Sequence, residues 1–162
     1  MKRSVIAVYV ENKYGVLARV AGLFMRKGFN IDSLTVGETD DPKFSRITIT
    51  LHGDNYAREQ LVTQLQKLYN VKQVRLLESG VERELMLIKV RNSPENRGEV
   101  MAAAEVYRAK IIDYTTDTLC VEVTGEPSKI NAFIEVMKPL GIVEMCRTGV
   151  VSLERGGSIL EK

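Results

Sequence analysis

The segment Glu11–Leu17 combines residue types that could bind a small charged molecule. It joins an apolar stretch to a helical pattern, and the start of a helix offers unpaired backbone N–H groups and a partial positive charge that favour a carboxylate. Gly15 has no Cβ, so a ligand can approach these amides. Asn12 carries both a donor and an acceptor, which suits the two charged groups of a free amino acid. The segment is therefore a candidate amino-acid site.

Further residues extend this candidate site. Val16, Leu17 and Ile31 are candidates for an apolar lining around a branched side chain, and Asn30, at the head of the next strand, offers a second polar group. A plainer interpretation stays open, in which Gly15 only provides a turn with positive φ and Asn12 caps the helix. The local pattern alone does not decide between the two.

Residues typical of enzymes and metal sites are missing from recognisable contexts. The sequence has no phosphate-binding glycine loop, no Cys/His cluster with metal spacing and no Gly-x-Ser-x-Gly motif. His52 is the one histidine, Asp40 and Asp41 are typical turn formers, and Cys120 and Cys146 fit buried, reduced thiols in strands. We expect no catalytic residue, no metal site and no cofactor in this chain.

Composition excludes several other classes of protein. The 162 residues suffice for two compact domains of about 75 residues each. A net charge of +2, without a basic face, argues against nucleic acid as a partner. No apolar run approaches the roughly 20 residues of a membrane span, and the short stretch Val5–Val10 lacks the features of a signal peptide. We expect a cytoplasmic protein that does not bind membranes.

The elements that position the candidate site follow from changes in hydrophobic period. Strand patterns have a period near two and helical patterns a period near 3.6. In the first half the expected strands are Ser4–Val10, Asn30–Gly37, Ser45–Leu51 and Val71–Leu77, and the expected helices are Val16–Lys27 and a segment between Asn55 and Asn70. The order β-α-β-β-α-β predicts a ferredoxin-like unit, an antiparallel sheet with both helices on one face.

The second half repeats this order. Its expected strands are Glu84–Val90, Lys110–Tyr114, Leu119–Thr124 and Gly141–Arg147, and its expected helices are Pro94–Tyr107 and Pro127–Met137. We therefore predict an α+β protein with two ferredoxin-like βαββαβ domains, 1–78 and 82–162, joined by a short linker. The second half has a longer loop, 92–98, where the first half has Gly15, so we expect one ligand site per chain.

The first expected strand also suggests a dimer. Both of its faces are apolar, whereas helices cover only one face of a ferredoxin-like sheet. A second copy of the domain is the expected cover for the other face.

The residues of both halves resemble a known family, the small regulatory subunits of acetolactate synthase (acetohydroxyacid synthase). The motifs are Glu11-Asn12-x-x-Gly15-Val16-Leu17, Arg26-x-Gly28-Phe29-Asn30-Ile31-Asp32-Ser33-Leu34, Glu82-Arg83-Glu84-Leu85-Met86 and Arg147-Thr148-Gly149-Val150-Val151. The first motif resembles ACT domains in general, whereas the blocks together are specific to this subunit. The resemblance runs across essentially the whole chain.

The resemblance implies that residues 1–78 are an ACT domain that dimerises and binds valine between two copies. The matching positions are Asn12, Gly15, Val16, Leu17, Asn30 and Ile31. It further implies a separate catalytic subunit carrying thiamine diphosphate, FAD and magnesium, which this chain stimulates and makes sensitive to valine in branched-chain amino-acid biosynthesis. The alternatives are a free-standing ACT sensor that regulates another enzyme or transcription, a small α+β enzyme, and a scaffold without a ligand.

Overall fold

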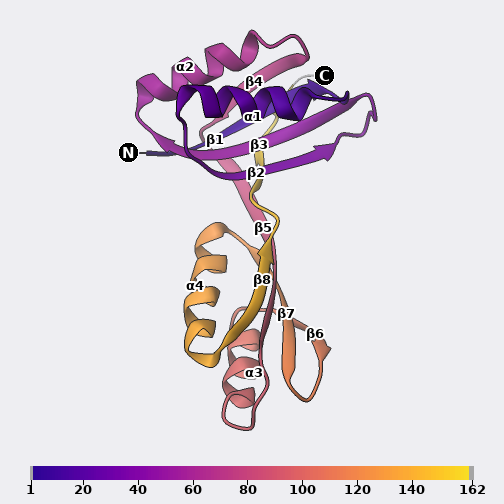
Figure 1. Ribbon diagram of the computed structural model, residues 1–162, viewed down its shortest axis with the longest axis vertical. Helices are drawn as coiled ribbons and strands as arrows, with labels where there is room; N and C mark the ends of the chain where they lie inside the picture. Colours follow the sequence, from indigo (N-terminus) through magenta and orange to yellow (C-terminus); the bar gives the residue numbers. More distant parts are fainter. Residues whose placement is uncertain (1, 161–162) are drawn as a thin grey trace. The chain divides into compact units, whose positions relative to one another are not determined.

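The computed structural model describes residues 2–160, which divide into two compact units. The first unit comprises residues 2–81 and 150–160, and the second comprises Glu82–Gly149. Each unit contains the order strand, helix, strand, strand, helix, strand (Figure 1), so the predicted repeat is confirmed. No helix in this described range is long and apolar enough to cross a membrane.

The first unit is an antiparallel sheet in the order β2-β3-β1-β4, with α1 and α2 on one face (Figure 1). Its elements are β1 (Lys2–Glu11), α1 (Val16–Lys27), β2 (Ile31–Glu38), β3 (Phe44–Gly53), α2 (Asn55–Gln66) and β4 (Val71–Leu77). The apolar stripe of α1 enters the core through Val20 and Phe24. The helix ends at Gly28, whose φ of 70° is a left-handed conformation that glycine adopts without strain.

Part of the other face of this sheet is covered by the chain's own C-terminal segment, residues 150–160. Val5, Ala7 and Leu77 form a small buried cluster on this face, and Leu160 packs against it. For Val5 and Ala7, the expectation that a second copy provides the cover is therefore wrong. The apolar second face of β1 does not by itself require a dimer.

Polar contacts also bind the C-terminal segment to the first unit. The Arg46 Nη2 donates to the Ser152 carbonyl at 2.8 Å, and the Arg75 Nη1 donates to the Ser158 hydroxyl at 2.8 Å. The expected second domain 82–162 thus extends too far, because its last residues pack on the first unit.

The second unit has the same topology, with strand order β6-β7-β5-β8. Its elements are β5 (Gly80–Arg91), α3 (Arg97–Val106), β6 (Lys110–Tyr114), β7 (Thr118–Gly125), α4 (Pro127–Met137), a 3-10 turn (Lys138–Leu140) and β8 (Ile142–Arg147). The helix α3 begins three residues after the predicted Pro94, because the Ser93 carbonyl accepts hydrogen bonds from the N–H groups of Asn96 and Arg97 in a separate turn. Cys120 and Cys146 are free thiols in strands, as predicted, but Cys120 is only half-buried and Cys146 is exposed.

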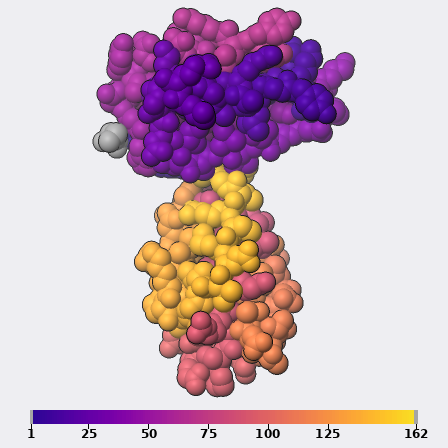
Figure 2. Space-filling view, in the orientation of Figure 1, coloured from indigo at the N-terminus to yellow at the C-terminus, as the bar shows by residue number. Residues whose placement is uncertain are grey.

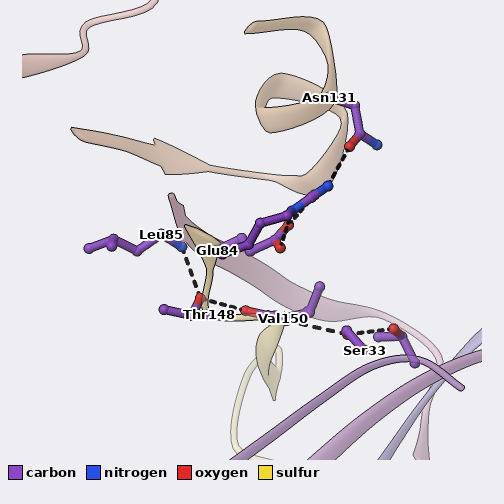
Figure 3. A network of polar contacts seen from close by, with 9 residues as sticks. Ser33, Glu84, Leu85, Asn131, Thr148 and Val150 are labelled. Carbon is purple, nitrogen blue, oxygen red and sulfur yellow. Dashed lines mark hydrogen bonds and ion pairs between the residues drawn. The ribbon is translucent and has the colours of Figure 1, made fainter. Parts of the chain in front are cut away.

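An ion pair between a buried carboxylate and a partly exposed guanidinium joins β5 to the last residue of β8 in the second unit (Figure 3). The guanidinium of Arg147 donates to both carboxylate oxygens of Glu84, each at 2.8 Å, and its Nη1 donates to Asn131 at 3.0 Å. The Glu84 side chain is only 4% exposed. This network fixes the end of β8 to α4 and to the middle strand of the sheet.

Candidate functional site

The candidate site begins at Gly15, the residue that precedes α1. Its φ is 80°, a left-handed conformation, and it makes the helix start without any side-chain cap. A Cβ at this position would meet no atom within 4 Å, so the space beside Gly15 is open. The positive φ of Gly15 agrees with both interpretations of this loop, whereas the open approach to the backbone is the feature that a ligand site requires.

Backbone N–H groups at the start of α1 are available to a ligand. The N–H of Val16 donates to the Lys13 carbonyl at 3.4 Å, and that of Arg19 donates to the Gly15 carbonyl at 3.0 Å. For the N–H groups of Leu17 and Ala18 there is no acceptor among residues 2–160. The first turn holds no acidic residue, so no side chain of this turn neutralises the positive end of the helix. These features favour a bound carboxylate.

Asn12 does not cap the helix, which excludes that part of the plainer interpretation. Its Nδ2 donates to the Pro42 carbonyl at 3.0 Å and to the Glu38 carboxylate at 3.2 Å, and its backbone N–H donates to the Lys43 carbonyl at 2.7 Å. These contacts fix the amide plane against the hairpin between β2 and β3. The Oδ1 of the exposed Asn12 is the atom of this amide that remains to accept a hydrogen bond from a ligand.

The carboxylate of Glu11, the last residue of β1, is held by three donors. Its carboxylate lies 2.8 Å from Lys72 Nζ and 3.2 Å from Lys13 Nζ, and it accepts a hydrogen bond from Asn70 at 2.7 Å. The hydrogen bonds from Lys72 first, then from Asn70 and Lys13, lower the pKa of Glu11 from 4.5 to about 2. The same contact raises the pKa of Lys72. Both groups are therefore charged at neutral pH.

The other two predicted polar and apolar positions, Asn30 and Ile31, lie at the opposite end of the sheet. Ile31 pairs with Leu51 of β3, whereas Glu38, at the end where Asn12 lies, pairs with Ser45. Six residues of β3 separate these partners, which corresponds to about 20 Å of strand. One chain does not bring Asn12 and Asn30 together.

The three predicted apolar residues differ in what they can offer a ligand. Val16 is 4% exposed and its side chain belongs to the core, so only its backbone lies at the loop. Leu17 is 44% exposed, and Ile31 is half-buried against the same core. In the space-filling view the indigo N-terminal part of the chain lies at the surface of the first unit (Figure 2).

The second unit has a counterpart of Asn12 that the sequence analysis missed, Asn92. Its backbone N–H donates to the Asp117 carbonyl at 2.8 Å and its Nδ2 to the Thr115 carbonyl at 2.6 Å, as Asn12 does to its own hairpin. Its Oδ1, however, already accepts a hydrogen bond from Arg97 Nε at 2.8 Å. The second loop is thus closed by its own cation, which agrees with one site per chain. An asparagine directly after the first strand of each half was the signal available in the sequence.

Metal ligands do not gather anywhere in the described chain. No group of three or more His, Cys, Asp or Glu side chains within residues 2–160 has an arrangement that holds a metal ion.

Comparison with known proteins gives matches along both units. A family model described as the ACT domain of the AHAS small subunit matches residues 6–73, and one described as the small subunit of acetolactate synthase matches residues 83–156. A probable acetolactate synthase small subunit from Archaeoglobus fulgidus is 52% identical over 152 residues, covering 93% of this chain and 96% of that protein. The small subunit of acetolactate synthase isozyme 3 from Escherichia coli is 44% identical over 161 residues, covering 98% and 99%.

The fold agrees with a solved structure. The crystal structure of the acetolactate synthase small subunit from Thermotoga maritima superposes with a TM-score of 0.91 at 39% identity, and the match covers 98% of this chain and 100% of that one. Sequence, fold and family models agree over nearly the full length, and we conclude that this chain belongs to the family of acetolactate synthase small subunits.

Proposed function

We propose that this chain is the regulatory subunit of a cytoplasmic acetolactate synthase, which binds and stimulates a separate catalytic subunit and makes it sensitive to feedback inhibition by valine. The thiamine diphosphate, FAD and magnesium of the reaction belong to that catalytic subunit in this proposal. Membership of the small-subunit family supports the partner. The observation that supports the valine site is the start of α1 at Gly15, which has no side-chain cap, no acidic residue in its first turn and open space beside the backbone.

A site with halves about 20 Å apart in one chain is completed only by a second copy. In a two-fold symmetric dimer, the loop of one chain meets Asn30 of the other, and the exchange produces two equal sites. The homodimer is therefore part of the proposal, and it rests on the completeness of the site rather than on an uncovered sheet face.

In this proposal the loop Glu11–Leu17 forms one half of the valine site, and its polar groups have separate roles. The N–H groups of Leu17 and Ala18 hold the valine carboxylate at the positive end of α1. The Asn12 Oδ1 accepts from the ammonium, because its Nδ2 is already bonded to the hairpin. Asn30 and Ile31 of the second copy supply a further polar contact and an apolar wall.

Regulation follows if valine binds one dimer arrangement more tightly than another. A ligand shifts a conformational equilibrium only by its difference in affinity for the two states. A site that spans two chains meets this condition, because any change in the arrangement of the two chains changes the distance between the halves. The catalytic subunit then responds to the arrangement that valine selects.

The proposal is tested by Gly15→Asp with Gly15→Asn as its matched control. Both residues tolerate positive φ better than most others, so the backbone strain is similar, and both side chains enter the open space beside Gly15. The aspartate adds a negative charge where the ligand carboxylate lies. We expect Gly15→Asp to abolish valine binding in titration calorimetry, and Gly15→Asn to weaken it less.

Reconstitution with the catalytic subunit completes this test. We expect Gly15→Asp to stimulate the catalytic subunit as the wild type does while the holoenzyme no longer responds to valine. Unchanged valine binding in Gly15→Asp would show that the carboxylate lies elsewhere. Failure of the wild type to bind or stimulate the catalytic subunit would favour a free-standing amino-acid sensor.

A further inference from the structure

Asn70 lies between the residues at the two ends of the loop Glu11–Leu17. It lies between α2 and β4, and it is only 5% exposed although its side chain is polar. A buried amide is retained without penalty only when its donor and acceptor both have partners. The contacts of Asn70 therefore indicate what this residue does.

The contacts of Asn70 reach both ends of the loop. Its Nδ2 donates to the Glu11 carboxylate at 2.7 Å, and its backbone carbonyl accepts the Glu11 N–H at 2.9 Å. Its Oδ1 accepts a hydrogen bond from Arg19 Nη1. Glu11 directly precedes Asn12, and Arg19 lies in the first turns of α1, where its N–H donates to the Gly15 carbonyl.

An asparagine suits this position for a chemical reason. One neighbour is an anion that needs a donor, and the other is a cation that needs an acceptor. An amide offers both at once, whereas a carboxylate offers only acceptors and an apolar side chain offers neither. Hydrogen bonds to charged groups are also stronger than those between neutral groups.

We propose that Asn70 is a positioning residue for the loop Glu11–Leu17. It holds Glu11 and Arg19 together and so sets the separation of the Asn12 Oδ1 from the free amides of α1. It does not touch the ligand in this proposal. The inference rests on the proposed function for its link to valine, whereas its structural part concerns only the order of the loop. The low pKa of Glu11 agrees with it, since Asn70 is one of the causes.

The first test compares Asn70→Asp with Asn96→Asp in the intact chain. Asn96 also donates its Nδ2 to a distant part of the chain, the Leu140 carbonyl at 2.6 Å, but it belongs to the second unit. We expect Asn70→Asp to raise the valine Kd by about tenfold, because one charge-assisted hydrogen bond is replaced by repulsion between carboxylates. Asn96→Asp should leave the Kd unchanged.

A reciprocal swap separates positioning from a general loss of structure. In the double variant Glu11→Gln with Asn70→Asp, the donor and acceptor exchange places, and the new carboxylate still accepts from Arg19. We expect the double variant to recover most of the lost affinity. Failure of the swap to improve on Asn70→Asp would overturn the proposal.

Hydrogen exchange provides a readout that does not depend on valine. The Asn12 and Arg19 amides, bonded to Lys43 and Gly15, should exchange faster in Asn70→Asp, while the amides of β3 remain protected. Should that variant not fold, Arg19→Gln removes one contact of the same amide at an exposed position, and the same faster exchange is expected.

The outcomes distinguish this inference from the proposed function. A wild-type chain that does not bind valine refutes the proposed function, and the exchange data still test the order of the loop. A wild-type chain that binds valine, together with an Asn70→Asp variant of equal affinity and equal exchange, refutes the positioning role alone.

Discussion

Truncation of Arg147 is predicted to destabilise the second unit strongly. The variant Arg147→Ala removes both donors from the Glu84 carboxylate, which is 4% exposed, and also the donor to Asn131. Removal of one partner from a buried ion pair costs about 3–5 kcal/mol, because the remaining charge stays buried without compensation. The Arg147 side chain is 31% exposed, so in the variant water can replace part of the lost hydrogen bonding to the Glu84 carboxylate. We therefore expect a value at the lower end, about 3 kcal/mol.

One further variant separates the contribution of the charge from that of the paired hydrogen bonds, and a second variant is a control. Arg147→Lys keeps the charge but loses the paired geometry with the two carboxylate oxygens, and roughly half of the full loss is expected. Arg83→Ala is the control, taken from the strand that carries Glu84, because its contact with Glu126 spans 3.9 Å and both side chains are more than half exposed. Such a surface pair contributes below about 1 kcal/mol.

Native-state hydrogen exchange of the intact chain is the appropriate assay. It follows the amides of β5 and β7 in the second unit separately from those of the first, so that no two-state assumption for the whole chain is needed. A loss of about 3 kcal/mol corresponds to opening that is more than a hundredfold more frequent. An effect of Arg147→Ala no larger than that of Arg83→Ala would refute the reasoning that the buried pair stabilises this unit.

Two predictions concern the first unit. Gly80→Ala should loosen residues 150–160, since a Cβ there would clash with Ser152 Oγ. Ser152→Ala removes a buried hydroxyl without a partner and should leave stability unchanged or raise it, as thermal unfolding of both variants will show. The stabilising effect of the Glu11 carboxylate should be complete above its ordinary pKa of 4.5 and decline as the pH falls toward about 2, so exchange of the loop amides in wild type and Glu11→Gln should converge across this range.

Local patterns determined most of the secondary structure correctly. The predicted bounds of α1 and α4 agree with the structure, because an apolar face recurring every three to four residues and a clear start or stop mark both helices. Lys27-Gly28 ends α1, and Pro127 occupies the first turn of α4. The repeat of the strand and helix order then predicted the topology of both sheets.

Contacts between distant parts of the sequence could not be predicted in the same way. The return of residues 150–160 to the first unit depends on packing over Val5 and Ala7, which a local period does not encode. The roles of Asn70 and Arg97 likewise depend on which charged groups the fold brings beside them. The separation of Asn12 from Asn30 needed the strand register, which only the structure provides.

The proposed valine site is shared between two chains, and a mixed dimer tests this arrangement directly. The measurement is the number of valine molecules bound by a dimer purified with two different tags, one chain carrying Gly15→Asp and the other Asn30→Ala. Each homodimer has two defective sites. In the mixed dimer both defects fall in one site, and the other site keeps its loop from one chain and Asn30 from its partner. We predict about one valine per mixed dimer, half the wild-type number, and none for either homodimer. A mixed dimer that binds no valine would contradict the shared site.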